Sequence, residues 1–327
     1  MNPTPALQPD FPQHITRPQA WEKRVVPVLS RIICALTFCL LFVGAMVTST
    51  RSGLSVPDWP TTFGHNMFLY PLNQMRGGVV YEHSHRLFAS SVGMLTLLLA
   101  LATFLWEPRR WVRGVAITAF ILVCLQGVLG GLTVLYKLPV PVASAHAGVG
   151  ELFFCVTIWL SWATSSAWKK SQQWRWNKLA VAAFVVTLIA FAQVLVGAVM
   201  RHSYAGLAIP TFPDAFGAFI PPFWNHGIAL NFAHTRVGAL LVVLGCLHLI
   251  AAMLRNRYGV KCALFLFAVL VVQVVLGILT VLTGKVPWVA SLHLAGGALL
   301  LGTVFTILLW SGKTFPSKSS SATRFAS

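Results

Sequence analysis

Four histidines, His85, His146, His234 and His293, are the residues of this sequence whose types and spacing best suit chemistry. His146 and His293 are 147 positions apart, and His85 and His234 are 149 positions apart. Each is expected near the same end of a different apolar helix, so each half of the chain offers two imidazoles at one depth. Such a pair can clamp the iron of a flat macrocycle from both faces. We therefore expect a bis-histidine haem site in each half.

Two simpler interpretations compete with haem. Buried histidines can be satisfied by hydrogen bonds between membrane helices, but ionisable residues in membrane spans are mostly functional, and four related by an internal symmetry argue against this reading. A non-haem metal would need carboxylate or thiolate ligands at the same depth, where only Glu82 is available. The sequence has no Cys-x-x-Cys-His segment, so we expect non-covalent haem.

Glu82 precedes His85 by three residues and therefore lies on the same helix face, about one turn away. Arg86 follows Glu82 at i+4, so a simple salt bridge is an alternative role for both. The corresponding residue of the second half is Asn231, which does not exchange a proton at neutral pH. This difference predicts one catalytic centre, with Glu82 as its catalytic group, and one electron-transfer centre. Arg86 and Arg236 are placed to pair with haem propionates.

Four further polar residues receive simpler interpretations. Arg51 and Arg201 lie in or beside outer loops and are expected to snorkel to the membrane interface. His202 has no counterpart in the other half and is expected to be solvated. His248 follows His234 by 14 residues and so should lie on nearly the same helix face, about 21 Å deeper, but it has no partner at that depth.

The elements that must position these residues are membrane helices. The chain has 327 residues, of which 57% are hydrophobic and 9% charged, and its mean hydropathy is +0.75. A soluble core cannot hold that apolar mass. A helical span needs about 20 residues, and eight apolar runs qualify. We therefore expect an all-α polytopic membrane protein whose spans lie at about 26–48, 79–106, 113–135, 144–166, 177–200, 226–252, 261–283 and 289–310.

The net charge of +17 fits this topology. In a soluble chain it would suggest nucleic acid, but 16 of the 24 lysines and arginines fall on one side of the eight spans. By the positive-inside rule, both termini are predicted to be cytoplasmic. Basic loops that contact anionic membrane lipid explain the charge, and no nucleic-acid partner is expected. All six cysteines lie in or at the edges of spans, so no disulfide is expected.

An internal repeat organises the eight spans. At an offset of 147, residues 126–150 match residues 273–297 at 13 of 25 positions. At an offset of 153, Gly44 and Gly53 match Gly197 and Gly206. The repeat predicts two tandem, pseudo-symmetric four-helix bundles related by an axis along the membrane normal. The predicted division is a cytoplasmic tail at 1–25, bundles at 26–167 and 168–311, and a second cytoplasmic tail at 312–327.

These residues resemble the haem A synthase family of respiratory membranes, and the resemblance covers nearly the whole chain. The matching segments are Gly53-Leu54-Ser55-x-Pro57-Asp58-Trp59, Glu82-x-x-His85-Arg86, Asn231-x-x-His234, His146 and His293. One departure is the extra residue between His234 and Arg236, which leaves the role of Arg236 open.

The resemblance implies an oxidoreductase of the bacterial inner membrane. Such an enzyme hydroxylates one ring methyl of haem O twice, and loss of water then gives the formyl group of haem A. The substrate haem would lie in the 26–167 bundle, between His85 and His146 beside Glu82. A resident haem B would lie in the 168–311 bundle, between His234 and His293.

Partners follow from the same resemblance: an electron donor, the haem O synthase and the terminal oxidase assembly are candidates, and a homo-oligomer is compatible with the sequence. Two other functions stay open at this point. One is a di-haem b-type electron-transfer cytochrome without chemistry on the macrocycle. The other is a haem transporter or chaperone, which a parallel repeat would also suit.

Overall fold

The computed structural model of the protein describes residues 22–170, 173–255 and 259–313. Within these ranges there is no β-strand, and eight helical segments are long and apolar enough to cross a membrane. The predicted all-α polytopic fold and its eight spans are therefore confirmed, with ends that differ from the predicted ones by a few residues. The predicted tails, 1–25 and 312–327, lie largely outside the described residues.

The spans begin and end where the sequence supplies the usual signals. Asn177 and Asn225 are N-caps whose side-chain oxygens accept hydrogen bonds from backbone N–H groups of the first turn. Pro287 opens the last helix at a position where its missing N–H has no cost. The helices are α1 (Glu22–Ser49), α2 (Gly78–Trp106), α3 (Arg110–Leu135), α4 (Val140–Thr164), the short α5 (Ser166–Lys170), α6 (Lys178–His202), α7 (His226–Phe232), the π-helix η4 (Ala233–Gly238), α8 (Ala239–Arg255), α9 (Val260–Leu282) and α10 (Pro287–Ser311).

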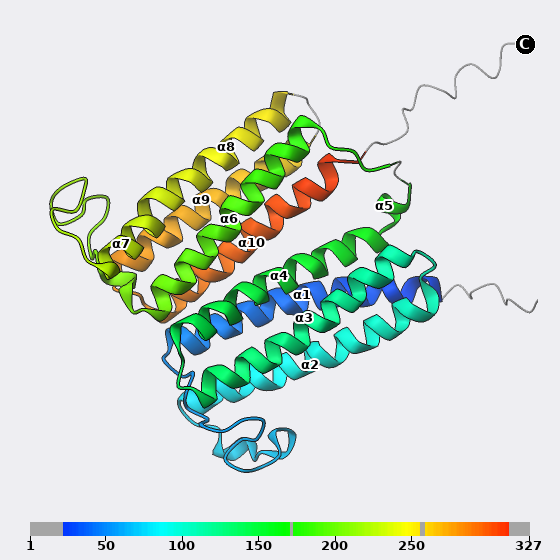
Figure 1. The fold of residues 1–327 in the computed structure, drawn as a ribbon, viewed down its shortest axis with the longest axis horizontal. Coiled ribbons are helices and arrows are strands. Elements are labelled where there is room, and N and C mark those ends of the chain that lie inside the picture. The colour runs from blue at the N-terminus through cyan, green and yellow to red at the C-terminus, as the bar shows by residue number, and fades with distance from the viewer. Residues whose placement is uncertain (1–21, 171–172, 256–258, 314–327) are drawn as a thin grey trace, which may run out of the picture.

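The long helices pack in two groups (Figure 1). In the first bundle, α1 packs on α2 and α4, and α3 packs on the same two helices. In the second bundle, α6 and α9 each pack on both α8 and α10, and α7, η4 and α8 form one continuous span. The bundles meet through α1 and α4 on one side and α6 and α10 on the other.

The start of α1 and the end of α10 lie at the same end of the helices in Figure 1. We call this the basic end, because most of the described lysines and arginines lie in its helix termini and loops. We call the opposite end the histidine end. Two loops cap it, residues 50–77 over the first bundle and 203–225 over the second.

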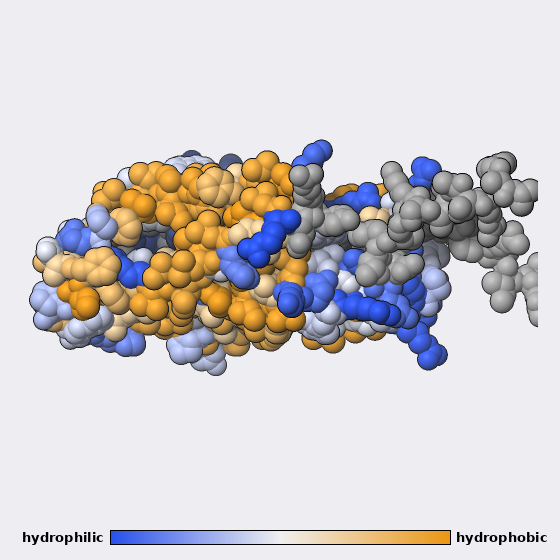
Figure 2. Space-filling view, turned by 90° about the horizontal axis from the view of Figure 1, so that it is seen from above, coloured by the Kyte–Doolittle hydropathy of each residue, from blue (hydrophilic) through white to orange (hydrophobic). Residues whose placement is uncertain are grey.

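The apolar core of each bundle fills the half next to the basic end. In the first bundle it includes Ile33, Leu99 and Leu160, and in the second Leu249 and Leu266; all five are fully buried. Figure 2 shows hydrophobic residues in a band across the middle of the molecule, with hydrophilic residues toward both ends. Many large apolar side chains of the spans are exposed, as expected for helices that face lipid. The histidine end, with less apolar core, is the half left for the candidate site.

Candidate haem sites

The four histidines all lie at the histidine end, on α2, α4, η4 and α10. In the second bundle the ring centroids of His234 and His293 are 6.4 Å apart, and the ring planes are nearly perpendicular at 87°. A bond from an imidazole nitrogen to a metal is about 2.0–2.1 Å, so two such bonds account for about two thirds of that separation. In the first bundle, His146 lies near enough to His85 to act on it electrostatically.

Each of the four rings lies against a glycine of a neighbouring helix. A Cβ atom on that glycine would lie 3.0 Å from His85 at Gly44, 3.3 Å from His146 at Gly130, 2.6 Å from His234 at Gly197 and 2.9 Å from His293 at Gly277. Carbon atoms in ordinary contact are about 3.5–4.0 Å apart. The rings therefore occupy space that only glycine leaves open. In the sequence these glycines were recognised as markers of the repeat, and their role beside the rings was missed.

The polar atoms of the rings show whether the residues fit haem. Nδ1 of all four histidines is buried and has no hydrogen-bond partner among the described residues, although the rings as a whole are half-buried. The edge of each ring that carries Nδ1 and Cε1 faces the glycine of the neighbouring helix, so Nε2 is the nitrogen left to hold iron. No cluster of three or more His, Cys, Asp or Glu suited to a metal ion occurs in the described part of the chain. Two imidazoles suit a haem iron, since the macrocycle supplies the other ligands, and the residues fit one haem in each bundle.

Glu82 is 3% exposed, and both of its carboxylate oxygens accept a hydrogen bond. Arg86 Nη2 donates to Oε1 at 2.6 Å, and Val56 N donates to Oε2 at 2.8 Å. The guanidinium of Arg86 also donates to the carbonyls of Val56, Asp58 and Thr61. The salt bridge that the sequence allowed is present. It belongs to a larger network that ties the first outer loop to α2.

The loop itself is held by Asp58, whose carboxylate accepts hydrogen bonds from Phe63 N at 2.8 Å and Gly64 N at 2.9 Å. Partial burial opposes ionisation, but these bonds and one from Thr61 outweigh it and lower the pKa of Asp58 below its usual value. The neighbouring Trp59 ring packs against Gly131 of α3. These contacts hold the turn at residues 58–64 together and pack it on α3 at the histidine end.

Arg236 makes the matching contacts in the second bundle. Its Nη2 donates to the carbonyls of Thr211 at 3.0 Å and Asp214 at 2.7 Å. These two carbonyls correspond, at the repeat offset of 153, to two of those that Arg86 contacts. Arg236 thus ties its own outer loop to its helix in the way that Arg86 does.

The extra residue between His234 and Arg236 is taken up by the π-helix Ala233–Gly238. A π turn holds one more residue than an α turn, and such bulges concentrate at functional sites. The bulge lets His234 and Arg236 keep the places of His85 and Arg86 despite the changed spacing. The inserted residue also shifts every later residue of the span by one position around the helix axis. His248, expected on the face of His234, is exposed instead, and that expectation was wrong.

Asn231 replaces Glu82 in the second bundle with the opposite hydrogen-bond polarity. It is fully buried, and its Nδ2 donates to the carbonyls of Ala205 at 3.0 Å and Gly206 at 3.2 Å. Each residue therefore anchors its outer loop, Glu82 by accepting from the backbone and Asn231 by donating to it. The first site alone keeps an ionisable group at this position.

Arg201 does not snorkel to the interface, and that expectation was wrong. Its Nη2 donates across the bundle boundary to Ala45 O at 2.9 Å and Ser49 Oγ at 2.7 Å of α1. Ser291 of α10 donates to the same Ser49 oxygen at 2.9 Å. The second lone pair of the Ala45 carbonyl and the Ser49 hydroxyl accept these bonds, which lipid chains cannot do, so the guanidinium turns inward. His202 beside it is half-buried rather than solvated.

The fold and site define a class of protein: a polytopic helical membrane protein with paired, half-buried imidazoles at one end of each bundle. The sequence matches the COX15-CtaA family, cytochrome oxidase assembly proteins, over residues 28–305, and the chain belongs to that family. With its eight apolar helices it is a multi-pass protein of the cell inner membrane.

Curated relatives are similar over most of their length. A heme A synthase of Shouchella clausii is 28% identical over 296 residues, covering 85% of this chain and 93% of the relative. One of Halalkalibacterium halodurans is 27% identical, covering 83% and 90%. One of Rhodopseudomonas palustris is 27% identical, covering 85% and 86%.

Proposed function

We propose that this protein is a haem A synthase, an oxidoreductase that converts the ring methyl of haem O to a formyl group by successive hydroxylations. The observation that carries the proposal is the similarity to heme A synthases over more than four fifths of this chain. The two glycine-backed histidine pairs support it, because each offers the ligand set that a haem needs.

In this proposal the two bundles have different tasks. The substrate haem O binds between His85 and His146, where Glu82 supplies an ionisable group one turn away. A resident haem B, held non-covalently between His234 and His293, supplies one-electron redox chemistry when bound. Asn231 near the second pair offers no proton at neutral pH, which suits a site that only passes electrons.

Glu82 is the proposed catalytic group. Arg86 Nη2 and Val56 N each donate a hydrogen bond to one of its carboxylate oxygens, so the carboxylate is held in one orientation near the first histidine pair. Each oxygen accepts one hydrogen bond and keeps a second lone pair at which a proton can be held, while Arg86 joins the carboxylate to the outer loop.

Arg86 and Arg236 are proposed to lie beside the propionates of the two haems. Arg86 already donates three hydrogen bonds to loop carbonyls, and Arg236 donates two. Arg236 Nε, buried and without a partner among the described residues, is the donor available to a propionate in the second bundle. By holding the loops, both arginines also keep water from the histidine end.

The orientation proposed is the one that the charges favour: the basic end faces the cytoplasm, and both haem sites lie toward the outer face. An electron donor is required, because each hydroxylation with molecular oxygen consumes two electrons. The haem O synthase and the terminal oxidase assembly are proposed partners, which would hand over the substrate and receive the product.

Pigment analysis tests the proposal. The chain is expressed in cells that make haem O but no haem A, and the extracted pigments are separated and weighed by mass spectrometry. We expect haem A with the unaltered chain and with His248→Ala, an exposed histidine outside both pairs. Haem A should be absent with His85→Ala. A folded preparation that binds reducible haem yet yields no haem A would contradict the synthase and favour an electron-transfer cytochrome.

A further inference from the structure

The glycine that backs each histidine ring is preceded, four residues earlier on the same helix, by a second position of interest. In three of the four helices that position is a glutamine: Gln126 before Gly130, Gln193 before Gly197 and Gln273 before Gly277. In α1 it is Leu40, before Gly44. Residues four apart lie on one helix face about one turn from each other. Each glutamine therefore faces the same histidine helix as its glycine, one turn nearer the basic end.

Two of these glutamines bind the backbone of the histidine itself. Gln126 Nε2 donates to the carbonyl of His146 at 2.7 Å, and Gln193 Nε2 donates to that of His234, also at 2.7 Å. A backbone carbonyl has two lone pairs, so it can accept a side-chain amide in addition to its bond within the helix. Each of these bonds fixes the turn that carries the histidine against the neighbouring helix.

Each glutamine amide occupies the space left by another glycine, one turn after the histidine. A Cβ atom would lie 3.4 Å from Gln126 Nε2 at Gly150 and 3.3 Å from Gln273 Nε2 at Gly297, and it would overlap the Gln193 amide at Gly238. Gln273 thus has the same place beside α10 that Gln126 has beside α4. We call each glutamine with this second glycine a histidine clamp: Gln126 with Gly150, Gln193 with Gly238, and Gln273 with Gly297.

Of the four histidines, His85 alone has no histidine clamp. The residue one turn after it is Ala89 and not glycine, and the residue at the matching place of α1 is Leu40, which carries no amide. The serine hydroxyls of this part of α2 donate to the carbonyls of Arg86 and Leu87. Among the described residues, no side chain donates to the carbonyl of His85. Both members of the histidine clamp are therefore replaced together at this one position.

The surroundings of the rings differ in the same way. The backbone of each clamp glutamine lies close enough to the ring of its histidine to act on it electrostatically. The groups that act on the His85 ring are His146 and Arg86, neither of which belongs to α1. A metal-ligating histidine usually directs its second ring nitrogen at a backbone carbonyl, a carboxylate or water, which fixes the ring. Three rings have a backbone partner within reach, and α1 offers His85 none.

We propose that His85 is the releasable iron ligand of this protein, which leaves the iron when haem enters or leaves the first bundle, whereas the histidine clamps keep the other three histidines in place. The inference rests on the proposed function, in which the first bundle must load a substrate haem and release a product haem at every turnover. The second bundle must keep its haem. The histidine clamps are distributed accordingly, with one in the first bundle, at His146, and both histidines of the second bundle clamped.

The size of the effect follows from the hydrogen bond. A hydrogen bond between membrane helices changes an equilibrium constant by a factor of about 3–10. A clamped histidine must break this bond, or strain it, when its turn of helix moves away from the iron. We therefore expect the clamped histidines to leave the iron about 3- to 10-fold more slowly than His85 does.

Carbon monoxide binding to the reduced full-length protein in mild detergent, with haem O added until both bundles are filled, tests the proposal. Carbon monoxide takes only an iron position that an imidazole has left, so at saturating concentration its binding rate is the rate of histidine release. Leu40→Gln with Ala89→Gly installs a histidine clamp on His85. Gln193→Met removes the amide that holds His234 and keeps the length of the side chain.

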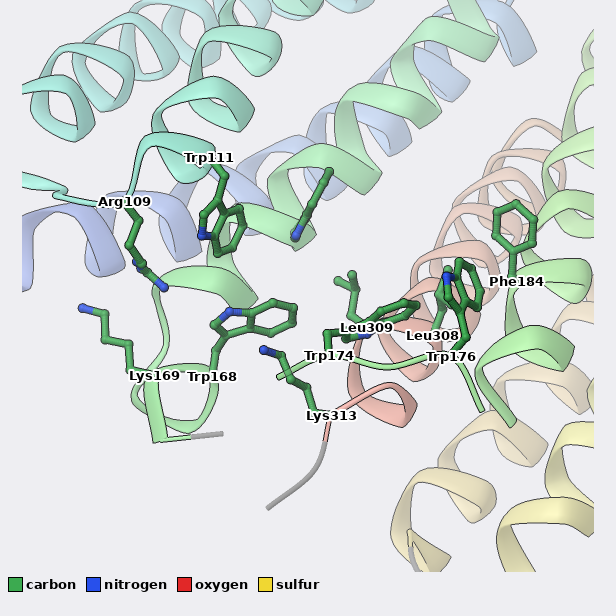
Figure 3. Close-up of a pocket in the computed structure, with 11 residues that line it drawn as sticks. Arg109, Trp111, Trp168, Lys169, Trp174, Trp176, Phe184, Leu308, Leu309 and Lys313 are labelled. Carbon is green, nitrogen blue, oxygen red and sulfur yellow. The ribbon is translucent and has the colours of Figure 1, made fainter. Parts of the chain in front are cut away.

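Each test variant has a matched control on the same helix. Leu36→Gln places an amide on α1 one turn from Leu40, and both leucines are half-buried. Phe184→Leu alters α6, the helix of Gln193, at the opposite end of the span. Phe184 lines a cavity of about 720 Å³ at the basic end, and none of the residues that line this cavity belongs to the haem sites (Figure 3).

We expect carbon monoxide to bind in two phases, a fast one from the first bundle and a slow one from the second. The installed histidine clamp should slow the fast phase about 3- to 10-fold and leave the slow phase unchanged. Gln193→Met should accelerate the slow phase by a similar factor and leave the fast phase unchanged. Both controls should behave as the unaltered protein does.

A single phase in the unaltered protein, a fast phase that the installed histidine clamp leaves unchanged, a slow phase that Gln193→Met leaves unchanged, or an equal change in a control would overturn the proposal. The readout does not require haem A to be formed. Failure to make haem A therefore contradicts the proposed function, whereas unchanged phases in a protein that makes haem A contradict only the releasable His85.

Discussion

Replacing Gly197 by alanine should cost the second site its haem while leaving α6 helical. The new Cβ would lie 2.6 Å from Cε1 and 3.1 Å from Nδ1 of His234. Because carbon contacts settle at about 3.5–4.0 Å, the ring must recede by roughly 1 Å. Such overpacking lowers the stability of the fold by about 1–3 kcal/mol. The higher helix propensity of alanine offsets up to about 1 kcal/mol of this loss. The fold should survive that cost, but a metal–nitrogen bond of about 2.0–2.1 Å would not tolerate a displacement of the ring by roughly 1 Å.

The other three glycines make a graded series. The Cβ separations predict a loss that decreases from Gly197 to Gly277 at 2.9 Å, Gly44 at 3.0 Å and Gly130 at 3.3 Å. Gly127→Ala is the matched control, because it lies on α3 one turn from Gly130 and its Cβ would meet nothing within 4 Å. Haem per protein, from the pyridine haemochrome, and the reduced-minus-oxidised spectrum are measured on each purified variant.

The reasoning fails if Gly197→Ala keeps its haem and an unchanged spectrum while eluting as a folded protein. It fails equally if Gly127→Ala loses as much haem as Gly197→Ala, because the effect would then belong to helix packing in general and not to the rings.

Three further predictions follow from the site. Glu82→Gln should keep the haem of the second bundle and lower haem A formation about 100-fold or more, as for loss of a general acid or base; an unchanged haem A yield would leave Glu82 a loop anchor only. Arg201→Gln should cost about 1.5–3 kcal/mol through its charged hydrogen bonds and lower the unfolding temperature, whereas Arg51→Gln, exposed at the same end, should not. Because the folded pKa of Asp58 lies below its unfolded value, the loop's stabilisation is complete above about pH 3.9 and is lost as pH falls through that lowered pKa. Pepsin should therefore cleave residues 50–77 faster at the lowest pH values, and Asp58→Asn should remove this dependence; equal pH profiles would refute it.

The sequence was sufficient for whatever depends on residues close together in the chain. The eight spans follow from apolar runs of the required length, since a bilayer imposes helices on any such run. The four histidines stood out because an internal repeat places like residues at like depths. Their assignment as iron ligands, the division into tandem bundles and the cytoplasmic side of the termini stay predictions.

The tertiary structure decided what depends on contacts between distant segments. Whether Glu82 is free or bonded depends on Val56, in a loop 26 positions away, and the direction of Arg201 depends on Ser49, 152 positions away. The face of His248 depended on a π turn that no periodicity reveals. The four glycines became interpretable only when a histidine of another helix was seen against each. Sequence spacing determines the position of a side chain along its helix. The packing of helices determines which residues that side chain contacts, because those residues are distant in the sequence.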